Sequence, residues 1–180
     1  MTAAHCNGGV GQRGTITMPK DGKKWNLRVV AHDRTSDLCW MVTEESIDDI
    51  CYAKLAPANP EVSTAVWHQG YGFHLPRNRE DGNVQASANS QGQIQFYLNV
   101  SSGDSGGGIF RADTNEWVAA VCCTQGIAQK TAMWGGGVDK ARQMLSALPA
   151  YYDPFPAPTL PHELLPEPRE WIPLQIPVVR

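Results

Sequence analysis

One serine stands where it could act as a nucleophile: Ser105 lies in the stretch 102–108, which reads Ser-Gly-Asp-Ser-Gly-Gly-Gly. A serine hydroxyl becomes a useful nucleophile only where a neighbouring base accepts its proton. The flanking glycines allow a tight turn whose backbone N–H groups point into one small space, and such a space can hold a negatively charged oxygen. An isolated Gly-Asp-Ser-Gly is more often an ordinary loop, so the stretch predicts chemistry only where a base and an acid accompany it.

Two other stretches supply that base and that acid. The first residues read Thr-Ala-Ala-His-Cys and contain His5, and Asp37 precedes an apolar run, Leu-Cys-Trp-Met. Acyl transfer by a serine needs a histidine to take the proton and a carboxylate to fix the tautomer of that histidine. Asp33 is a competing acid, but no apolar run follows it. His5, Asp37 and Ser105 are therefore the candidate catalytic residues.

The order His, Asp, Ser and the three local sequences resemble the chymotrypsin/trypsin-like serine proteases over roughly residues 1–148. Subtilisin-like enzymes and α/β-hydrolases carry the same groups in other orders. The resemblance implies a serine endopeptidase that acts on a peptide or protein substrate. In it Ser105 attacks the scissile carbonyl, His5 moves the proton, Asp37 orients His5, and the N–H groups of Gly103 and Ser105 form the oxyanion hole. This chemistry requires neither a metal ion nor an organic cofactor.

The resemblance also implies a specificity pocket. Asn99, six residues before the nucleophile, would lie at its base, and Cys122 and Cys123 begin the segment that would line it. An acid at the base would select Lys or Arg by charge pairing, and asparagine carries no charge, so trypsin-like specificity is disfavoured. Asp104 stands where zymogen-derived members pair an acid with a newly freed N-terminus. The sequence shows no activation site, so the role of Asp104 stays open.

The fold that the resemblance implies is all-β: two Greek-key barrels with the active site in the cleft between them, and a C-terminal helix. Alternation and turn residues predict strands over 15–18, 25–31, 38–42 and 116–122, and a hairpin formed by 84–88 and 93–100. We expect polar connections over 32–36 and 77–83. Helical spacing covers 139–148, with Asp139 as a plausible N-cap.

Three regions are expected along the chain. Residues 1–56 would form the remainder of a first barrel, 57–148 a second barrel with the helix, and 149–180 a tail. Met1 fits the apolar position that commonly precedes the histidine motif in the family, so we expect the first barrel to be incomplete in this sequence. Nine of the thirteen prolines fall in the tail, which predicts an extended segment. Both a disordered end and a strap that contacts another protein remain open.

Composition narrows the classes of partner. The net charge is −3 and the basic residues form no stripe, which argues against nucleic-acid binding. No apolar run approaches the ~20 residues of a membrane span, no signal peptide is visible, and the compartment stays unknown.

The sequence has five cysteines, which cannot all pair within one chain. It has no Cys-x-x-Cys motif, so a structural zinc site is not expected. Neighbouring residues of a strand point to opposite faces, so Cys122 and Cys123 are expected to diverge.

Two histidines other than His5 have simpler interpretations. His32 is expected to be a solvated loop residue, and His68 a core or surface residue, because no third metal ligand accompanies His68 and His74.

The predicted function also has an alternative. A triad on an incomplete barrel would lose the placement that catalysis needs. The chain would then be a non-catalytic peptide-binding module on a protease scaffold, or an inactive fragment.

Overall fold

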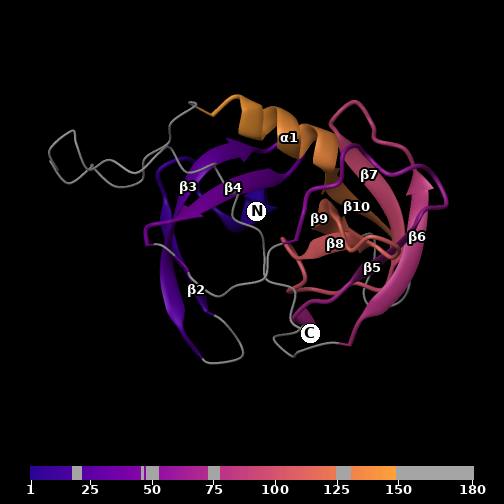
Figure 1. The fold of residues 1–180 in the computed structure, drawn as a ribbon, viewed down its shortest axis with the longest axis horizontal. Helices are drawn as coiled ribbons and strands as arrows, with labels where there is room; N and C mark the ends of the chain where they lie inside the picture. The colour runs from indigo at the N-terminus through magenta and orange to yellow at the C-terminus, as the bar shows by residue number, and fades with distance from the viewer. Residues whose placement is uncertain (18–21, 46, 48–52, 73–77, 125–130, 149–180) are drawn as a thin grey trace, which may run out of the picture.

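The computed structural model describes residues 1–17, 22–45, 47, 53–72, 78–124 and 131–148. Within these residues two units of antiparallel β-structure lie side by side, and a helix lies across the top of both in Figure 1. The tail predicted over 149–180 lies outside the described residues. None of the described helices has the length and the apolar character that a membrane crossing requires.

The first unit is a four-stranded sheet in the order β1-β4-β3-β2. Its strands are β1 (Thr2–Ala3), β2 (Arg13–Thr17), β3 (Lys24–Asp33) and β4 (Leu38–Thr43), and a short 3-10 helix, η1 (Ala4–Cys6), follows β1. In the β1–β4 pair, Thr2 lies opposite Cys39 and Ala3 opposite Leu38. This register brings the start of the chain beside the start of β4.

β3 is longer than the sequence indicates. The expected strand covered 25–31, and His32 and Asp33 were assigned to a polar connection. That assignment is wrong for these two residues, because His32 pairs with Cys39 and Asp33 with Leu38 in the β3–β4 ladder. The ladder therefore continues up to the turn at 34–37, and polar side chains at its end do not interrupt the backbone hydrogen bonds.

The second unit is a closed barrel of six strands in the order β10-β7-β6-β5-β8-β9. Closure removes the unpaired edges that an open sheet would leave. The strands are β5 (Ala65–His68), β6 (Glu80–Ala86), β7 (Gln93–Leu98), β8 (Gly108–Arg111), β9 (Trp117–Thr124) and β10 (Thr131–Gly137). The candidate nucleophile at 105 lies in the loop between β7 and β8.

The predicted hairpin is present as β6 and β7. β6 begins earlier than expected, at Glu80, so residues 80–83 of the expected polar loop are strand instead. Asn83 pairs with Ala65 on one side and with Tyr97 on the other, which fixes its backbone in the barrel. The polar side chains of this stretch are at least partly exposed to solvent, while Val84 is buried. A solvent-facing strand of this kind is easily mistaken for a loop.

The C-terminal helix α1 (Val138–Ser146) buries Val138, Ala141 and Met144, as its helical spacing predicts. Its N-cap is Gly137, and the expectation that Asp139 caps it is wrong. Asp139 lies in the first turn, where its carboxylate accepts from the Asn59 N–H at 3.1 Å and its own N–H donates to Asn59 Oδ1 at 3.1 Å. The carboxylate is thus used to hold the connection between the two units.

One hydrophobic core joins the two units. It includes Trp40 from the first sheet, Phe96 and Ile109 from the barrel, and Ala141 from the helix. The Trp40 indole Nε1–H donates to the Ala141 carbonyl at 3.0 Å, which ties β4 to α1. The all-β fold with a closed barrel, a partial barrel and a C-terminal helix is therefore confirmed. The region boundaries at 56 and 148 stay predictions.

Candidate active site

His5 and Asp37 form a hydrogen-bonded pair. His5 Nδ1 lies 2.6 Å from Asp37 Oδ2, and the His5 backbone N–H donates to Asp37 Oδ1 at 2.7 Å. The Asp37 backbone carbonyl also accepts from the Ala4 N–H at 3.0 Å. An ionised carboxylate only accepts hydrogen bonds, so the neutral ring carries its proton on Nδ1 and presents the Nε2 lone pair. The His5 side chain is 48% exposed, so solvent reaches part of the ring.

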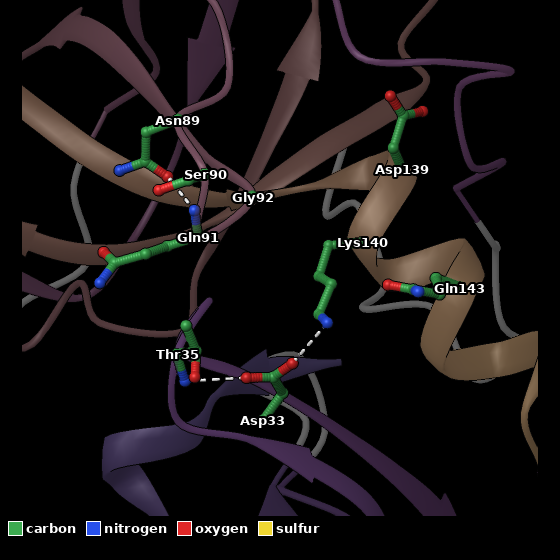
Figure 2. Close-up of a pocket in the computed structure, with 9 residues that line it drawn as sticks. All are labelled: Asp33, Thr35, Asn89, Ser90, Gln91, Gly92, Asp139, Lys140 and Gln143. Carbon is green, nitrogen blue, oxygen red and sulfur yellow. Dashed lines mark hydrogen bonds and ion pairs between the residues drawn. The ribbon is translucent and has the colours of Figure 1, made fainter.

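The turn before β4 aims the Asp37 carboxylate. Asp37 has a positive φ of 58°, a left-handed conformation that aspartate tolerates better than most residues. Asp33 Oδ1 accepts from the backbone N–H groups of Thr35 at 2.8 Å and Ser36 at 3.2 Å. Asp33 Oδ2 forms an ion pair with Lys140 Nζ from α1 at 2.8 Å, as Figure 2 shows. Asp33, the competing acid, therefore has a structural position, and Asp37 is the carboxylate on His5.

The pKa of Asp33 reflects these contacts. Partial burial alone would raise it, but the hydrogen bonds from Lys140, Ser36 and Thr35 outweigh burial and lower it. The second unit also touches this turn through β10, because a Cβ added to Gly136 would lie 2.7 Å from the Ser36 carbonyl oxygen. The absence of a side chain at Gly136 thus lets the two units meet closely beside Asp37.

A polar hollow of about 500 Å³ lies next to the Lys140–Asp33 ion pair (Figure 2). Its lining is polar and comes from both units and from α1: Asp33, Thr35, Asn89, Ser90, Gln91, Gly92, Asp139, Lys140 and Gln143. None of the three candidate catalytic residues lines it. We therefore interpret it as part of the junction between the units.

The Ser105 loop is held by backbone hydrogen bonds on both sides. The Asp104 N–H donates to Ser101 O at 3.1 Å, and the Gly106 N–H donates to Val121 O at 2.8 Å. Gly103 and Gly106 have φ values of 98° and 82°, where a side chain would be strained. Within the part of the chain that the structure describes, no backbone carbonyl accepts from the N–H groups of Gly103 and Ser105. These are the two donors predicted for the oxyanion hole.

Gly106 places the Ser105 loop directly against the strand that leads to His5. A Cβ added at Gly106 would lie 2.9 Å from the Ala3 backbone nitrogen and 3.2 Å from the Thr2 Cβ. The residue after the candidate nucleophile therefore contacts β1, two residues before the candidate base. This contact brings stretches about one hundred residues apart in the sequence to one place.

Cys122 and Cys123 do not diverge as expected. Their sulfur atoms lie 3.0 Å apart, because the β9–β10 ladder slips by one residue here and leaves Cys122 between the partners of Trp134 and Gly135. Cys122 is buried and Cys123 is exposed. Burial first, and then the nearby Asp37 carboxylate, raise the pKa of the Cys122 thiol. Cys122 therefore lies beside the His5–Asp37 pair as a neutral thiol.

The specificity pocket stays a prediction. Asn99 is half-buried and directly follows β7. Cys122 and Cys123 lie in β9, but residues 125–130, which continue from this strand, lie outside the described part of the chain. Among the described residues, no three His, Cys, Asp or Glu side chains gather closely enough to hold a metal ion.

Sequence analysis missed the structural position of one histidine near the site, His32, whereas the core position that it allowed for His68 is confirmed. His32, expected in a solvated loop, is half-buried at the end of β3, and its Nε2–H donates to the Ala4 carbonyl at 3.0 Å, which supports the turn that carries His5. His68 is buried next to Asp104. No period-2 alternation marks His32, because a bulge between Val29 and Ala31 interrupts the alternation of β3.

Comparisons with known proteins agree with this architecture. The family model of the trypsin-like peptidase domain matches residues 1–119. Solved structures of similar fold include the HtrA-type protease AlgW with a decapeptide, at TM-score 0.67 and 15% identity, and a serine endoprotease from Yersinia pestis, at TM-score 0.66 and 14% identity. A search of curated proteins found no match.

The coverage of these structures is unequal. Each of the two similarities covers 81% of this chain, but only 46% of the AlgW chain and 51% of the Yersinia pestis chain. This chain thus spans about half the length of the solved proteins that it resembles, and identities this low show a shared fold alone. The family match covers well over half of the chain and includes the histidine, aspartate and serine motifs. The chain therefore belongs to the family of trypsin-like peptidase domains.

Proposed function

We propose that this domain is a serine endopeptidase in which His5, Asp37 and Ser105 act as one catalytic unit. The observation that carries the proposal is the His5–Asp37 pair at 2.6 Å, with the Ser105 loop held against the same strand through Gly106. A structural histidine would not need a buried carboxylate on one nitrogen and solvent access on the other. A general base needs both features.

The reaction follows from these positions. The Ser105 hydroxyl gives its proton to His5 Nε2 while its oxygen attacks the carbonyl carbon of the peptide. The carbonyl π electrons move to the oxygen, and the N–H groups of Gly103 and Ser105 donate to this oxyanion. The intermediate then breaks its C–N bond, and the leaving amine takes the proton from His5. In the second half of the reaction, water gives a proton to His5 and attacks the carbonyl carbon of the acyl-serine ester. The intermediate then breaks its bond to the serine oxygen, which takes the proton from His5, and a carboxylic acid is released.

Asp37 contributes to this cycle by orienting the His5 ring and by stabilising the positive charge that this ring acquires. Its two oxygens fix both the backbone and the ring of His5, so the ring cannot turn its protonated nitrogen toward the serine. When His5 becomes an imidazolium, the adjacent carboxylate stabilises the positive charge. The geometry of the pair exists before substrate binds, and such preorganisation lowers the barrier without reorganisation during the reaction.

The proposed substrate class is a peptide or protein chain. The HtrA-type protease AlgW, which shares the fold, has been solved with a decapeptide and with a tripeptide. The β8 partners of β9 end at Ala120, whereas Cys123 and Thr124 pair with β10. The other edge of this end of β9 can therefore pair with an extended peptide backbone. The uncharged Asn99 disfavours Lys or Arg as the preferred residue at the cleaved bond. The proline-rich tail is a candidate contact for another protein.

The proposal is tested by incubating the chain with a mixture of unlabelled peptides and identifying new termini by mass spectrometry. We expect cleavage by the wild-type chain and none by Ser105→Ala. Ser102→Ala is the matched control, because Ser102 is an exposed serine of the same loop. We expect this variant to cleave peptides at the wild-type rate. Peptide binding without cleavage by the wild-type chain would favour the alternative, a non-catalytic peptide-binding module. Equal cleavage by Ser105→Ala would contradict the proposal.

A further inference from the structure

A buried histidine lies next to the Ser105 loop, beside a buried aspartate that belongs to this loop. His68 ends β5, and Asp104 immediately precedes Ser105; each residue is 1% exposed. His68 Nε2 lies 3.8 Å from Asp104 Oδ1, an ion-pair distance that is too long for a hydrogen bond. Burying a carboxylate is costly unless a positive charge and hydrogen-bond donors accompany it. Among the residues that the structure describes, His68 is a neighbour of Asp104 that can supply the charge.

The contacts of the His68 ring indicate which form it takes. His68 Nδ1 lies 2.9 Å from the Gly108 carbonyl oxygen, and a carbonyl only accepts, so Nδ1 carries a proton. The other ring nitrogen faces the Asp104 carboxylate. In the neutral ring a lone pair would face that negative charge, whereas the imidazolium presents an N–H to both acceptors. Both neighbours of the ring therefore favour the doubly protonated form.

Asp104 is held in its ionised form. Burial alone would raise its pKa, but the contacts from His68 and Ser101 outweigh burial and bring the pKa to about 2. Asp104 Oδ2 accepts from the Ser101 N–H at 2.8 Å and from the Ser101 hydroxyl at 3.2 Å. Among the described charged residues, Glu80 is the other that faces His68 in register, across the β5–β6 ladder, and it is half-buried.

Two glycines leave room for this pair. A Cβ added to Gly70 would lie 2.6 Å from His68 Nε2 and 3.0 Å from Asp104 Cγ. A Cβ added to Gly107 would lie 2.6 Å from His68 Cε1 and 2.9 Å from the Asp104 carbonyl oxygen. Backbone therefore approaches the pair from two sides, and any side chain there would push the imidazole and the carboxylate apart.

Asp104 connects this pair to the nucleophile. Its carboxylate binds Ser101 at the start of the loop, and its carbonyl oxygen accepts from the Gly107 N–H at 2.9 Å at the end. The segment between them contains Gly103 and Ser105, whose N–H groups are the proposed oxyanion donors. A rotation of the Asp104 side chain would release the start of the loop and redirect those donors.

We propose that His68 is a positioning residue whose imidazolium holds Asp104, and through it the oxyanion loop around Ser105. In zymogen-derived members of the resembled family a freed N-terminal ammonium pairs with the corresponding aspartate. Here β5 supplies the cation from within the barrel, so the loop takes its active shape without a cleavage step. The inference rests on the proposed function for its consequence, but the charge state of His68 can be tested independently of it.

The first test is ¹⁵N NMR of the histidine rings in the full chain at pH 7, with the His68 ring signals assigned through correlations to the backbone signals of the same residue. We expect both ring nitrogens of His68 to be protonated. A ring with one protonated and one unprotonated nitrogen would overturn the proposal. This measurement needs no substrate, so its outcome does not depend on whether the chain is a protease.

The second test follows the rate at which a fluorophosphonate labels Ser105. We expect His68→Gln to slow labelling by roughly tenfold or more, because a displaced loop misaligns the oxyanion donors. Adding Asp104→Asn to His68→Gln should recover much of the rate, since two neutral amides can hydrogen-bond each other and no buried charge remains unpaired. Asp81→Asn, at an exposed aspartate paired with Arg79, is the matched control and should leave the rate unchanged.

These results separate the two proposals. A wild-type rate in His68→Gln, or a double variant that is no faster than His68→Gln alone, would overturn the positioning role. If wild-type Ser105 is never labelled, the proposed hydrolase function fails, while the NMR result still decides the charge state of His68. If His68→Gln does not fold, as judged by circular dichroism, the NMR spectrum of the wild-type chain remains the deciding measurement.

Discussion

Asp37 receives two hydrogen bonds from one residue: Oδ1 accepts from the backbone N–H of His5 at 2.7 Å, and Oδ2 accepts from its ring Nδ1 at 2.6 Å. The carboxylate therefore fixes both the position of the His5 backbone and the orientation of its ring. Thirty-two residues separate the two in the sequence. The β1–β4 register, with Ala3 opposite Leu38, is what brings them together.

Asp37→Asn should abolish most of the activity while leaving the fold intact. The amide can offer only one acceptor oxygen, so it favours the wrong ring tautomer and cannot stabilise an imidazolium. We expect peptide hydrolysis to fall by about 10⁴-fold, the size that this substitution has in serine-protease triads. The control is Asp33→Asn, which leaves the carboxylate on His5 in place. A loss in Asp33→Asn equal to that in Asp37→Asn would contradict these assignments.

The Lys140–Asp33 ion pair should stabilise the junction of the two units by a modest amount. Both side chains are partly exposed, so we expect Lys140→Met to lower the free energy of unfolding by no more than about 1 kcal/mol. The folded-state pKa of Asp33 is lowered, so its contribution is present above its ordinary pKa and is lost as the pH falls through the folded value. Urea unfolding at neutral and acidic pH tests this, and a Lys140→Met effect that grows toward acid pH would contradict it.

Gly106→Ala should damage both stability and activity. The new Cβ would strain a φ of 82° and would also lie 2.9 Å from the Ala3 nitrogen. Gly11 is a matched control, because its φ is 89° and a Cβ there would meet nothing within 4 Å. We expect Gly11→Ala to cost about 1–2 kcal/mol for the left-handed backbone alone, and Gly106→Ala to cost more. Equal unfolding energies and equal hydrolysis rates for the two variants would exclude a tight contact between the loop and β1.

The cysteines should differ sharply in the rate at which thiol reagents modify them. Burial raises the pKa of Cys39 to about 11 and, together with Asp37, raises the pKa of Cys122. Thiolates are the reactive form, so iodoacetamide at pH 8 should modify Cys123 in the folded chain well before Cys39 or Cys122. Peptide mapping by mass spectrometry measures the order. Early modification of Cys122 would mean that it is neither buried nor beside a carboxylate.

The sequence predicted the fold class and the family better than it predicted contacts between distant segments. The order of His5, Asp37 and Ser105 and the apolar run of β4 are local signals, and they indicated a β-barrel serine protease. The side-by-side sulfurs of Cys122 and Cys123 depend on a slip between β9 and β10, which no pattern within β9 reveals.

The misses share one physical cause. The cap of α1, the end of β3 and the partner of Asp104 are each decided by a residue from another part of the chain: Asn59, Leu38 and His68 respectively. Polar residues in particular were assigned to loops, although tertiary hydrogen bonds hold them in strands. The role of Asp104 stayed open in the sequence because the histidine that lies 3.8 Å from its carboxylate stands thirty-six residues earlier, on β5.

Site-resolved labelling with a fluorophosphonate tests the central claim most directly. Mass spectrometry of the digested full chain should find one adduct per molecule, on Ser105, and its rate should fall steeply in His5→Ala and Asp37→Asn. A chain that forms no adduct on Ser105, or one whose Ser105 reacts equally fast without the His5 imidazole, would contradict a catalytic unit of these three residues.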